Sequence, residues 1–174
     1  TLAAEPAAQA DTAAGQTTTT QKDDGSTQLN AGEGVAYLHP NWKGEIVING
    51  GTAGDLSTVT SITFHYQADL SGITGYNIGA TSATDTSTPK QSTIIAYVDG
   101  TEMTIYSTAQ TMVFPENSSY LFAELVSMYT FSCGDVTIDT SGVLSMMGMF
   151  YRCKSLSQIE GINNWDTSNV AYIF

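Results

Sequence analysis

Asp139-Thr140-Ser141-Gly142-Val143 is the stretch that decides the fold, because its pattern returns 27 residues later as Asp166-Thr167-Ser168-Asn169-Val170. A fixed spacing of about 20 to 50 residues is typical of repeat proteins, in which each unit packs against its neighbours. One unit of this length cannot bury its apolar face alone, so stacked copies have to build a shared core. The sequence therefore indicates a repeat architecture in its C-terminal part.

One repeat unit is predicted to run turn, short helix, turn and strand. Asp, Thr and Ser side chains accept hydrogen bonds from free backbone N–H groups and favour turns and helix N-caps. The apolar run 143–150 has the length of about two helical turns, and the polar segment 151–154 follows it. Leu156 and Ile159 are the apolar positions of the short strand expected next.

Residues 139–170 resemble the leucine-rich-repeat-like surface proteins of bacteria that are often called BspA-like. The matching positions are Asp139, Thr140, Ser141, Val143, Met146, Met149, Phe150, Cys153, Ser155, Leu156, Asp166, Thr167, Ser168, Asn169 and Val170. This sequence departs from the family pattern at Gly142, where Asn is usual, and at Ile159-Glu160, where Leu-Asp is usual. The resemblance implies a solenoid with one strand and one short helix per repeat.

A weaker copy of the unit is predicted upstream, at Tyr120-Leu121-Phe122. One inserted residue aligns Phe122 with Phe150, because these residues precede Asp139 and Asp166 by 17 and 16 positions. The segment 117–122 also resembles the entry into the first repeat of the family. Since the last copy stops eight residues after Asp166, we expect the chain to continue beyond Phe174.

The part before the repeats has the pattern of a small antiparallel β domain. Val35–Leu38, Glu45–Ile48 and Thr111–Phe114 are expected strands, and residues 61–66 alternate polar and apolar side chains with the period of a half-buried strand. Asp99-Gly100 separates two β-rich runs, and this dipeptide is typical of a tight hairpin. We expect this domain to cover the open end of the first repeat.

These patterns together predict an α+β chain that is mostly β. Residues 1–30 are expected to be a disordered low-complexity linker, because they contain almost no large apolar side chain. Residues 31–115 are expected to be the β-rich capping domain, and residues 116–174 the beginning of a leucine-rich-repeat-like solenoid.

Charge and composition exclude several classes of partner. The formal net charge is −12, from 17 acidic and 5 basic residues, which opposes nucleic acid or an anionic membrane as a partner. No apolar run has the length of about 18 residues that a membrane-spanning helix needs. A composition with few charged residues and many Thr, Ser and Gly residues is typical of extracellular β-rich proteins.

The residue types that commonly take part in catalysis or metal binding do not form a recognisable pattern in this sequence. His39 and His65, the two histidines, have no Ser, Cys or Asp at motif spacing. Asp139 and Asp166 occupy the same repeat position, so capping of a turn is the expected role. We predict no catalytic, cofactor-binding or metal-binding residue and no cofactor. Cys133 and Cys153 are either two free thiols or one disulfide bridge.

The aromatic residues of the β-rich part leave two functions open. Most of Tyr37, Trp42, Tyr66, Tyr76, Tyr97 and Tyr106 are expected in the core, and any exposed ring is expected to line a protein- or glycan-binding face. The resemblance favours a non-enzymatic, adhesin-like scaffold on the bacterial cell surface that binds proteins or glycans of host or neighbouring cells. The alternative is a purely structural cap and spacer. A hydrolase has no supporting motif.

Overall fold

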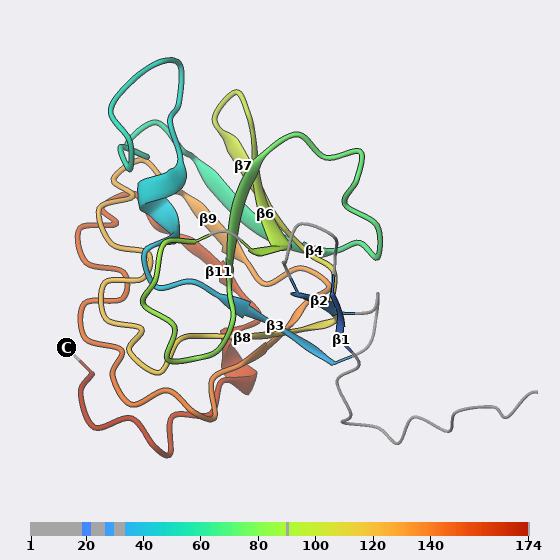
Figure 1. Ribbon diagram of the computed structural model, residues 1–174. Coiled ribbons are helices and arrows are strands. Elements are labelled where there is room, and N and C mark those ends of the chain that lie inside the picture. Colours follow the sequence, from blue (N-terminus) through green and yellow to red (C-terminus); the bar gives the residue numbers. More distant parts are fainter. Residues whose placement is uncertain (1–18, 22–26, 30–33, 90, 174) are drawn as a thin grey trace, which may run out of the picture.

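The computed structural model describes residues 19–21, 27–29, 34–89 and 91–173. Its main strands are β3 (Val35–Leu38), β4 (Ser61–Tyr66), β5 (Tyr76–Ala80), β6 (Gln91–Asp99), β7 (Glu102–Ser107), β8 (Thr111–Val113), β9 (Thr130–Ser132), β10 (Thr137–Asp139) and β11 (Gln158–Glu160). All nine belong to one sheet with the order β10-β8-β3-β5-β6-β7-β4-β9-β11 (Figure 1). Two short 3₁₀ turns, η1 (Trp42–Glu45) and η2 (Ile162–Asn164), lie outside the sheet.

The N-terminal segment contributes one separate antiparallel pair. This pair consists of β1 (Thr19–Gln21) and β2 (Thr27–Leu29). The rest of the linker expected at residues 1–30 lies outside the described residues.

The predicted α+β solenoid with a helix in each repeat is wrong. The part of the chain that the structure describes contains no α-helix, and the repeat strands β9, β10 and β11 extend the same sheet as the preceding strands. Residues 147–150 form turns in place of the expected helix, and Ser145 makes isolated bridges to Asn117 and Tyr172. Gly148 is the physical reason, because its φ of +59° lies in the left-handed region that interrupts a right-handed helix.

The predicted antiparallel pairing of the first part is also incomplete. β6 and β7 form the expected antiparallel hairpin across Asp99 and Glu102, with Gly100 at φ +61° in the loop. However, β4 pairs in parallel with both β7 and β9, and β3 pairs in parallel with β8. Residues 45–48, which were expected to be a strand, lie in η1 and the loop after it.

The sheet is strongly curled. β9 and β10 lie near opposite ends of the strand order, yet only residues 133–136 connect them. A link of this length spans at most about 18 Å, so the two ends of the sheet have to approach each other. The inner face of the curl holds the core. Its largest fully buried side chains include Trp42, Phe64, Phe114, Phe122 and Phe131.

Three connecting coils stack against one another beside the sheet. We call residues 114–129, 140–157 and 161–173 the coil stack, and Figure 1 shows them on one side of the sheet. The backbone N–H groups of Tyr120 and Phe122 donate to the carbonyls of Met147 and Met149, each at 2.9 Å and 27 residues further along the chain. The Met146 N–H likewise donates to Tyr172 in the third coil at 2.9 Å. The repeat spacing therefore measures the step from one coil to the next.

The upstream copy of the repeat has the predicted alignment. Phe122 and Phe150 stack with ring centroids 5.6 Å apart and an interplanar angle of 18°. Phe122 also contacts the rings of Trp42, Phe64, Phe114 and Phe131. This ring therefore joins the coil stack to the sheet.

Across the described residues, no helix is long and apolar enough to cross a membrane.

Candidate binding face

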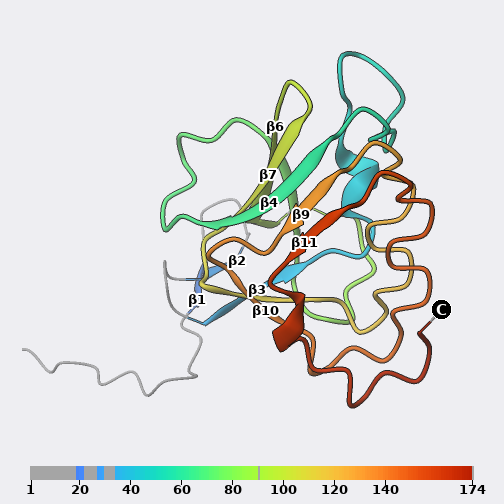
Figure 2. The same cartoon turned by 180° about the vertical axis from the view of Figure 1, so that it is seen from behind.

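The candidate surface is the outer face of β6, β7, β4, β9 and β11, which lie side by side in that order (Figure 2). Side chains that lie opposite each other on paired strands share one face of a sheet. The pairing registers therefore align the outward side chains in rows that cross all five strands. The first row is Asp99, Glu102, Ser61, Thr130 and Gln158, and the second is Tyr97, Thr104, Thr63, Ser132 and Glu160.

The alternating sequence of each strand produces this polar face. On β4, Ile62 and Phe64 point into the core and are fully buried, whereas Thr63 and His65 point outward. On β7, Met103 and Ile105 are buried in the same way. Because side chains alternate between the two faces of a strand, burial of the apolar set places the polar set outside. We call this surface the polar face.

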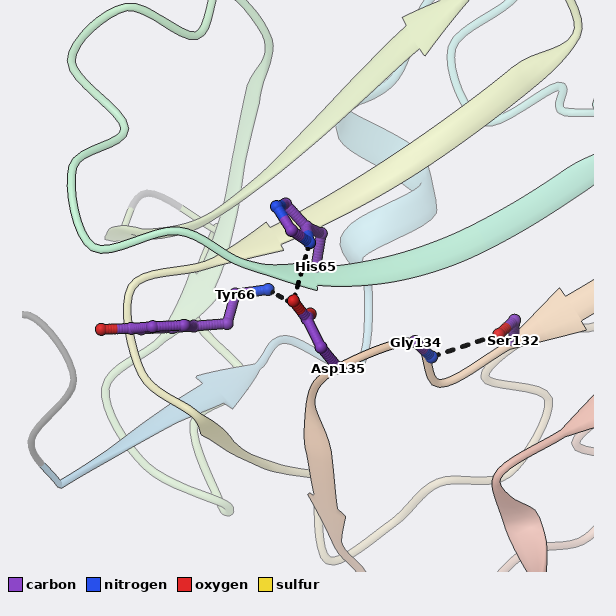
Figure 3. A network of polar contacts seen from close by, with 5 residues as sticks. All are labelled: His65, Tyr66, Ser132, Gly134 and Asp135. Atoms are coloured by element: carbon purple, nitrogen blue, oxygen red, sulfur yellow. Dashed lines mark hydrogen bonds and ion pairs between the residues drawn. The ribbon is translucent and has the colours of Figure 1, made fainter.

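A third, shorter row contains Tyr106 and His65, and His65 forms a pair with Asp135 (Figure 3). His65 lies opposite Tyr106 in the register of β4 and β7. Its Nδ1 atom is 3.0 Å from Oδ2 of Asp135, and both side chains are about half exposed. The other carboxylate oxygen, Oδ1 of Asp135, accepts a hydrogen bond from the Tyr66 N–H at 2.7 Å. Asp135 is therefore fixed by the backbone of β4 and in turn orients His65.

Gly134 places Asp135 at this position. Its φ is +56°, and a Cβ atom there would overlap the carbonyl oxygen of Phe64. Only glycine allows the chain to approach β4 this closely while it turns out of β9. The Gly134 N–H also donates to the hydroxyl of Ser132 at 3.2 Å (Figure 3).

The hydrogen bonds around the pair define which atoms remain available to a ligand. An ionised carboxylate only accepts hydrogen bonds, so His65 donates through Nδ1 and its Nε2 is an acceptor when the ring is neutral. The Ser132 hydroxyl donates to Oε2 of Glu160 at 3.2 Å and accepts from Gly134. It is therefore engaged with these groups. Among the residues that the structure describes, no group of three or more His, Cys, Asp or Glu side chains is arranged to hold a metal ion.

Three rings lie next to one another on β6, β7 and β4. Tyr97 and Tyr106 have centroids 6.5 Å apart, and Tyr106 and His65 have centroids 5.7 Å apart, both in edge-to-face geometry. Tyr97 is 38% exposed. Tyr97 and Tyr106 lie on the outward side of their strands, whereas Trp42 is fully buried and Tyr66 and Tyr76 pack against the core.

The residues predicted from the repeat lie in and beside the coil stack, where they make structural contacts. Asp139 accepts from the Ser141 N–H at 2.9 Å, and Asp166 accepts from the Ser168 N–H at 2.9 Å. These two turns are equivalent, as the repeat predicts, but neither begins a helix. The hydrogen bonds from Ser168 hold the pKa of Asp166 below its usual range.

Side-chain hydrogen bonds connect successive repeat turns. The hydroxyl of Thr140 donates to the Asp166 carbonyl at 3.0 Å, and the amide of Asn169 donates to the Ser141 carbonyl at 2.7 Å. Thr167, one unit after Thr140, is exposed. The repeat therefore uses its polar positions to hold one coil on the next.

The apolar repeat positions form the inside of the coil stack. Val143 and Met149 are buried, whereas Phe150, Leu156 and Val170 are half-buried and pack against the core. Each unit thus presents one apolar side to the sheet.

The two cysteines are free thiols, which settles the alternative that the sequence left open. The Cys153 thiol donates to the Phe122 carbonyl at 3.0 Å. Burial raises the pKa of the Cys133 thiol to about 11. Both thiols therefore contribute to the packing and hydrogen bonding of the fold.

A second surface feature is a hollow of about 390 Å³ between residues 40–41, 83–86 and 115–119. Its carboxylate at Asp85 is held by its own loop, because it accepts hydrogen bonds from Thr81 and from both the N–H and the hydroxyl of Ser87. These bonds hold the pKa of Asp85 far below its usual range. This carboxylate is thus part of the loop's structure.

His39, the other histidine, lies inside the molecule. It is fully buried, and its Nδ1 accepts from the Asn41 N–H at 2.9 Å.

The pair of His65 and Asp135 was missed by sequence reasoning because 70 residues separate the two side chains. The parallel register of β4 and β9, which pairs Thr63 with Ser132, is the information that brings them together.

No family model, curated protein or solved structure matches this chain. The geometry of the polar face and the repeat pattern are therefore the observations on which a function can be argued.

Proposed function

We propose that this protein is a non-enzymatic, adhesin-like binding scaffold of a bacterial cell surface, which holds proteins or glycans of host or neighbouring cells. The observation that carries the proposal is the polar face with its three neighbouring rings. The resemblance of residues 139–170 to BspA-like surface proteins supports the cellular setting. The acidic net charge of −12 opposes nucleic acid and anionic membranes as partners.

The shape of the polar face favours binding of an extended ligand. Five adjacent strands span about 19 Å at the usual separation of about 4.8 Å. The side chains of the two long rows are mostly short hydroxyls and carboxylates, and the paired backbone beneath them is rigid. A rigid surface loses little conformational entropy when a ligand binds.

The proposal is tested by measuring binding of the whole chain to immobilised mucin, extracellular matrix proteins and glycans. The double variant Thr63→Arg and Thr104→Arg places two long side chains in the centre of the polar face. Binding is expected to fall at least tenfold in this variant and to stay unchanged in Thr167→Arg, an exposed position of the coil stack. Absence of binding to every ligand, or equal binding by the double variant, would refute the proposal.

A structural spacer is the second candidate function, and one observation favours it. The exposed large apolar side chains include Ile159 on β11 and Ile162, Tyr172 and Ile173 in the third coil. Such side chains are suited to stacking against a further coil, as the second coil stacks against the first. Appending a copy of residues 148–174 after Phe174 should then raise the unfolding temperature. A chain that binds no ligand but gains stability from the added unit would favour the spacer over the adhesin.

A further inference from the structure

Three neighbouring rings on the polar face, which meet edge to face at interplanar angles of 60° and 75°, offer contact surfaces for sugar rings. Tyr97, Tyr106 and His65 come from three adjacent strands, and consecutive centroids are 6.5 Å and 5.7 Å apart. Aromatic rings offer a large contact area and lose little side-chain entropy. The C–H groups on one face of a pyranose ring are apolar, so they can contact such rings while the sugar hydroxyls stay free for hydrogen bonds.

The two long rows supply the complementary hydrogen-bonding groups. The hydroxyls of Ser61, Thr63 and Thr104 each donate one hydrogen bond and accept others, whereas carboxylates such as Glu102 only accept. Sugar hydroxyls also both donate and accept. They can therefore pair with hydroxyl and carboxylate groups in several orientations, which a surface without a deep pocket requires.

A protein ligand is less compatible with this surface. The rings lie on β6, β7 and β4, which are paired on both sides, and within the polar face only β11 ends the strand order; a strand could therefore be added only at β11, away from the rings. Protein interfaces also need a buried apolar centre with charged residues at the rim. The large apolar side chains in the rows are Tyr97 and Tyr106, and carboxylates accompany them.

The charge of the polar face selects against acidic ligands. Asp99, Glu102, Glu160 and Asp135 lie on or beside the rows, and the whole chain carries a net charge of −12. A sialylated or sulfated glycan would bring further negative charge onto this surface, and like charges repel.

From these observations we infer that the polar face binds a neutral glycan chain, with sugar rings on Tyr97 and Tyr106 and sugar hydroxyls on the two polar rows. His65 is a positioning and binding residue next to Tyr106. Since Asp135 holds its Nδ1–H, the neutral ring presents Nε2 as an acceptor for a sugar hydroxyl. This inference rests on the proposed function and specifies its ligand class.

Titration calorimetry with defined probes tests the inference. The neutral probes are chitohexaose, mannohexaose and a linear galactan, and the acidic probes are sialyllactose and a heparin hexasaccharide. At least one neutral probe should bind, and the acidic probes should bind at least tenfold more weakly. Stronger binding of an acidic probe, or binding of no neutral probe, would overturn the inference.

Variants locate the site and control for folding. Tyr106→Ala should weaken binding of the neutral probe by about tenfold, since one aromatic ring contact contributes about 1.5 kcal/mol, and Tyr106→Phe should retain most of the affinity. Tyr151→Ala removes a ring that is 54% exposed in the coil stack, and it should leave the affinity unchanged. Equal loss in Tyr106→Ala and Tyr151→Ala, or no loss in either, would contradict the assigned site.

The test separates this inference from the function on which it rests. If immobilised proteins bind the polar face while every neutral glycan fails, the glycan inference is wrong and the adhesin proposal stands. If neither proteins nor glycans bind, both are wrong.

His65→Gln should weaken binding of the neutral probe about threefold, because an uncharged acceptor remains but its orientation by Asp135 is lost.

Discussion

Replacement of Gly148 by alanine tests the conformation of the repeat unit, because a turn and a helix predict opposite changes in the free energy of unfolding. Gly148 has φ +59°, and a Cβ atom there would lie 2.5 Å from Cε1 of Tyr120. An L-residue in this left-handed conformation is strained by about 1–2 kcal/mol. In the short helix that the sequence predicts, the same substitution would stabilise the protein by about 0.8–1 kcal/mol.

The overlap with Tyr120 adds a smaller contribution to this cost. The Tyr120 side chain is 47% exposed, so its ring can rotate away from a methyl group at position 148. We therefore expect the free energy of unfolding to fall by about 1–2 kcal/mol, mostly from the backbone. In the double variant Gly148→Ala and Tyr120→Ala, which removes the overlap, most of the effect of Gly148→Ala should persist relative to Tyr120→Ala alone.

Equilibrium unfolding in urea, followed by tryptophan fluorescence, measures the effect. With a slope of about 2 kcal/mol/M, the midpoint should fall by about 0.5–1 M. Gly142→Ala is the matched control, because no atom lies within 4 Å of its added Cβ and its φ lies outside the left-handed region. Its midpoint should be unchanged or slightly raised. A midpoint for Gly148→Ala at or above that of the unmodified protein would refute the assigned turn.

Three further predictions concern the core, a loop and a thiol. Phe122→Ala should lower the free energy of unfolding by about 3–5 kcal/mol in urea, because this fully buried ring contacts five others; a loss below about 1 kcal/mol would contradict its central place. The lowered pKa of Asp85 contributes stability that is present above the unfolded-state pKa of about 4 and is lost as the pH falls toward the folded-state value. Unfolding measured from pH 5 to pH 2.5 should therefore show a shallower decline for Asp85→Asn than for the unmodified protein, and parallel curves would argue against these loop bonds. Because burial raises the pKa of Cys133 to about 11, this thiol is protonated at about pH 8 and should react with iodoacetamide much more slowly in the folded than in the urea-unfolded protein; equal rates would contradict its burial.

Local sequence patterns predicted the elements in which a single residue or short alternation decides the structure. The alternation in Ser61–Tyr66 produced a strand with Ile62 and Phe64 buried. The Asp99-Gly100 dipeptide produced the hairpin of β6 and β7. The spacing of the repeat also aligned Phe122 with Phe150, whose rings stack.

The remaining features depend on contacts that a local pattern does not contain. An apolar run such as residues 143–150 is compatible with two helical turns or with a coil that buries one side, and the positive φ of Gly148 favours the coil. Strand partners are equally undetermined by composition, so the parallel pairs of β4 with β7 and β9 were not predicted. The candidate site depends on this pairing, because it brings Asp135 to His65.

Amide chemical shifts during titration with the neutral hexasaccharides test the central claim, that the polar face is the ligand-binding surface. We predict that the largest shift changes fall on Tyr97, Thr104, Tyr106, Thr63 and His65, which form a contiguous surface on β6, β7 and β4. Changes confined to the coil stack, or no saturable change at any amide, would contradict the claim.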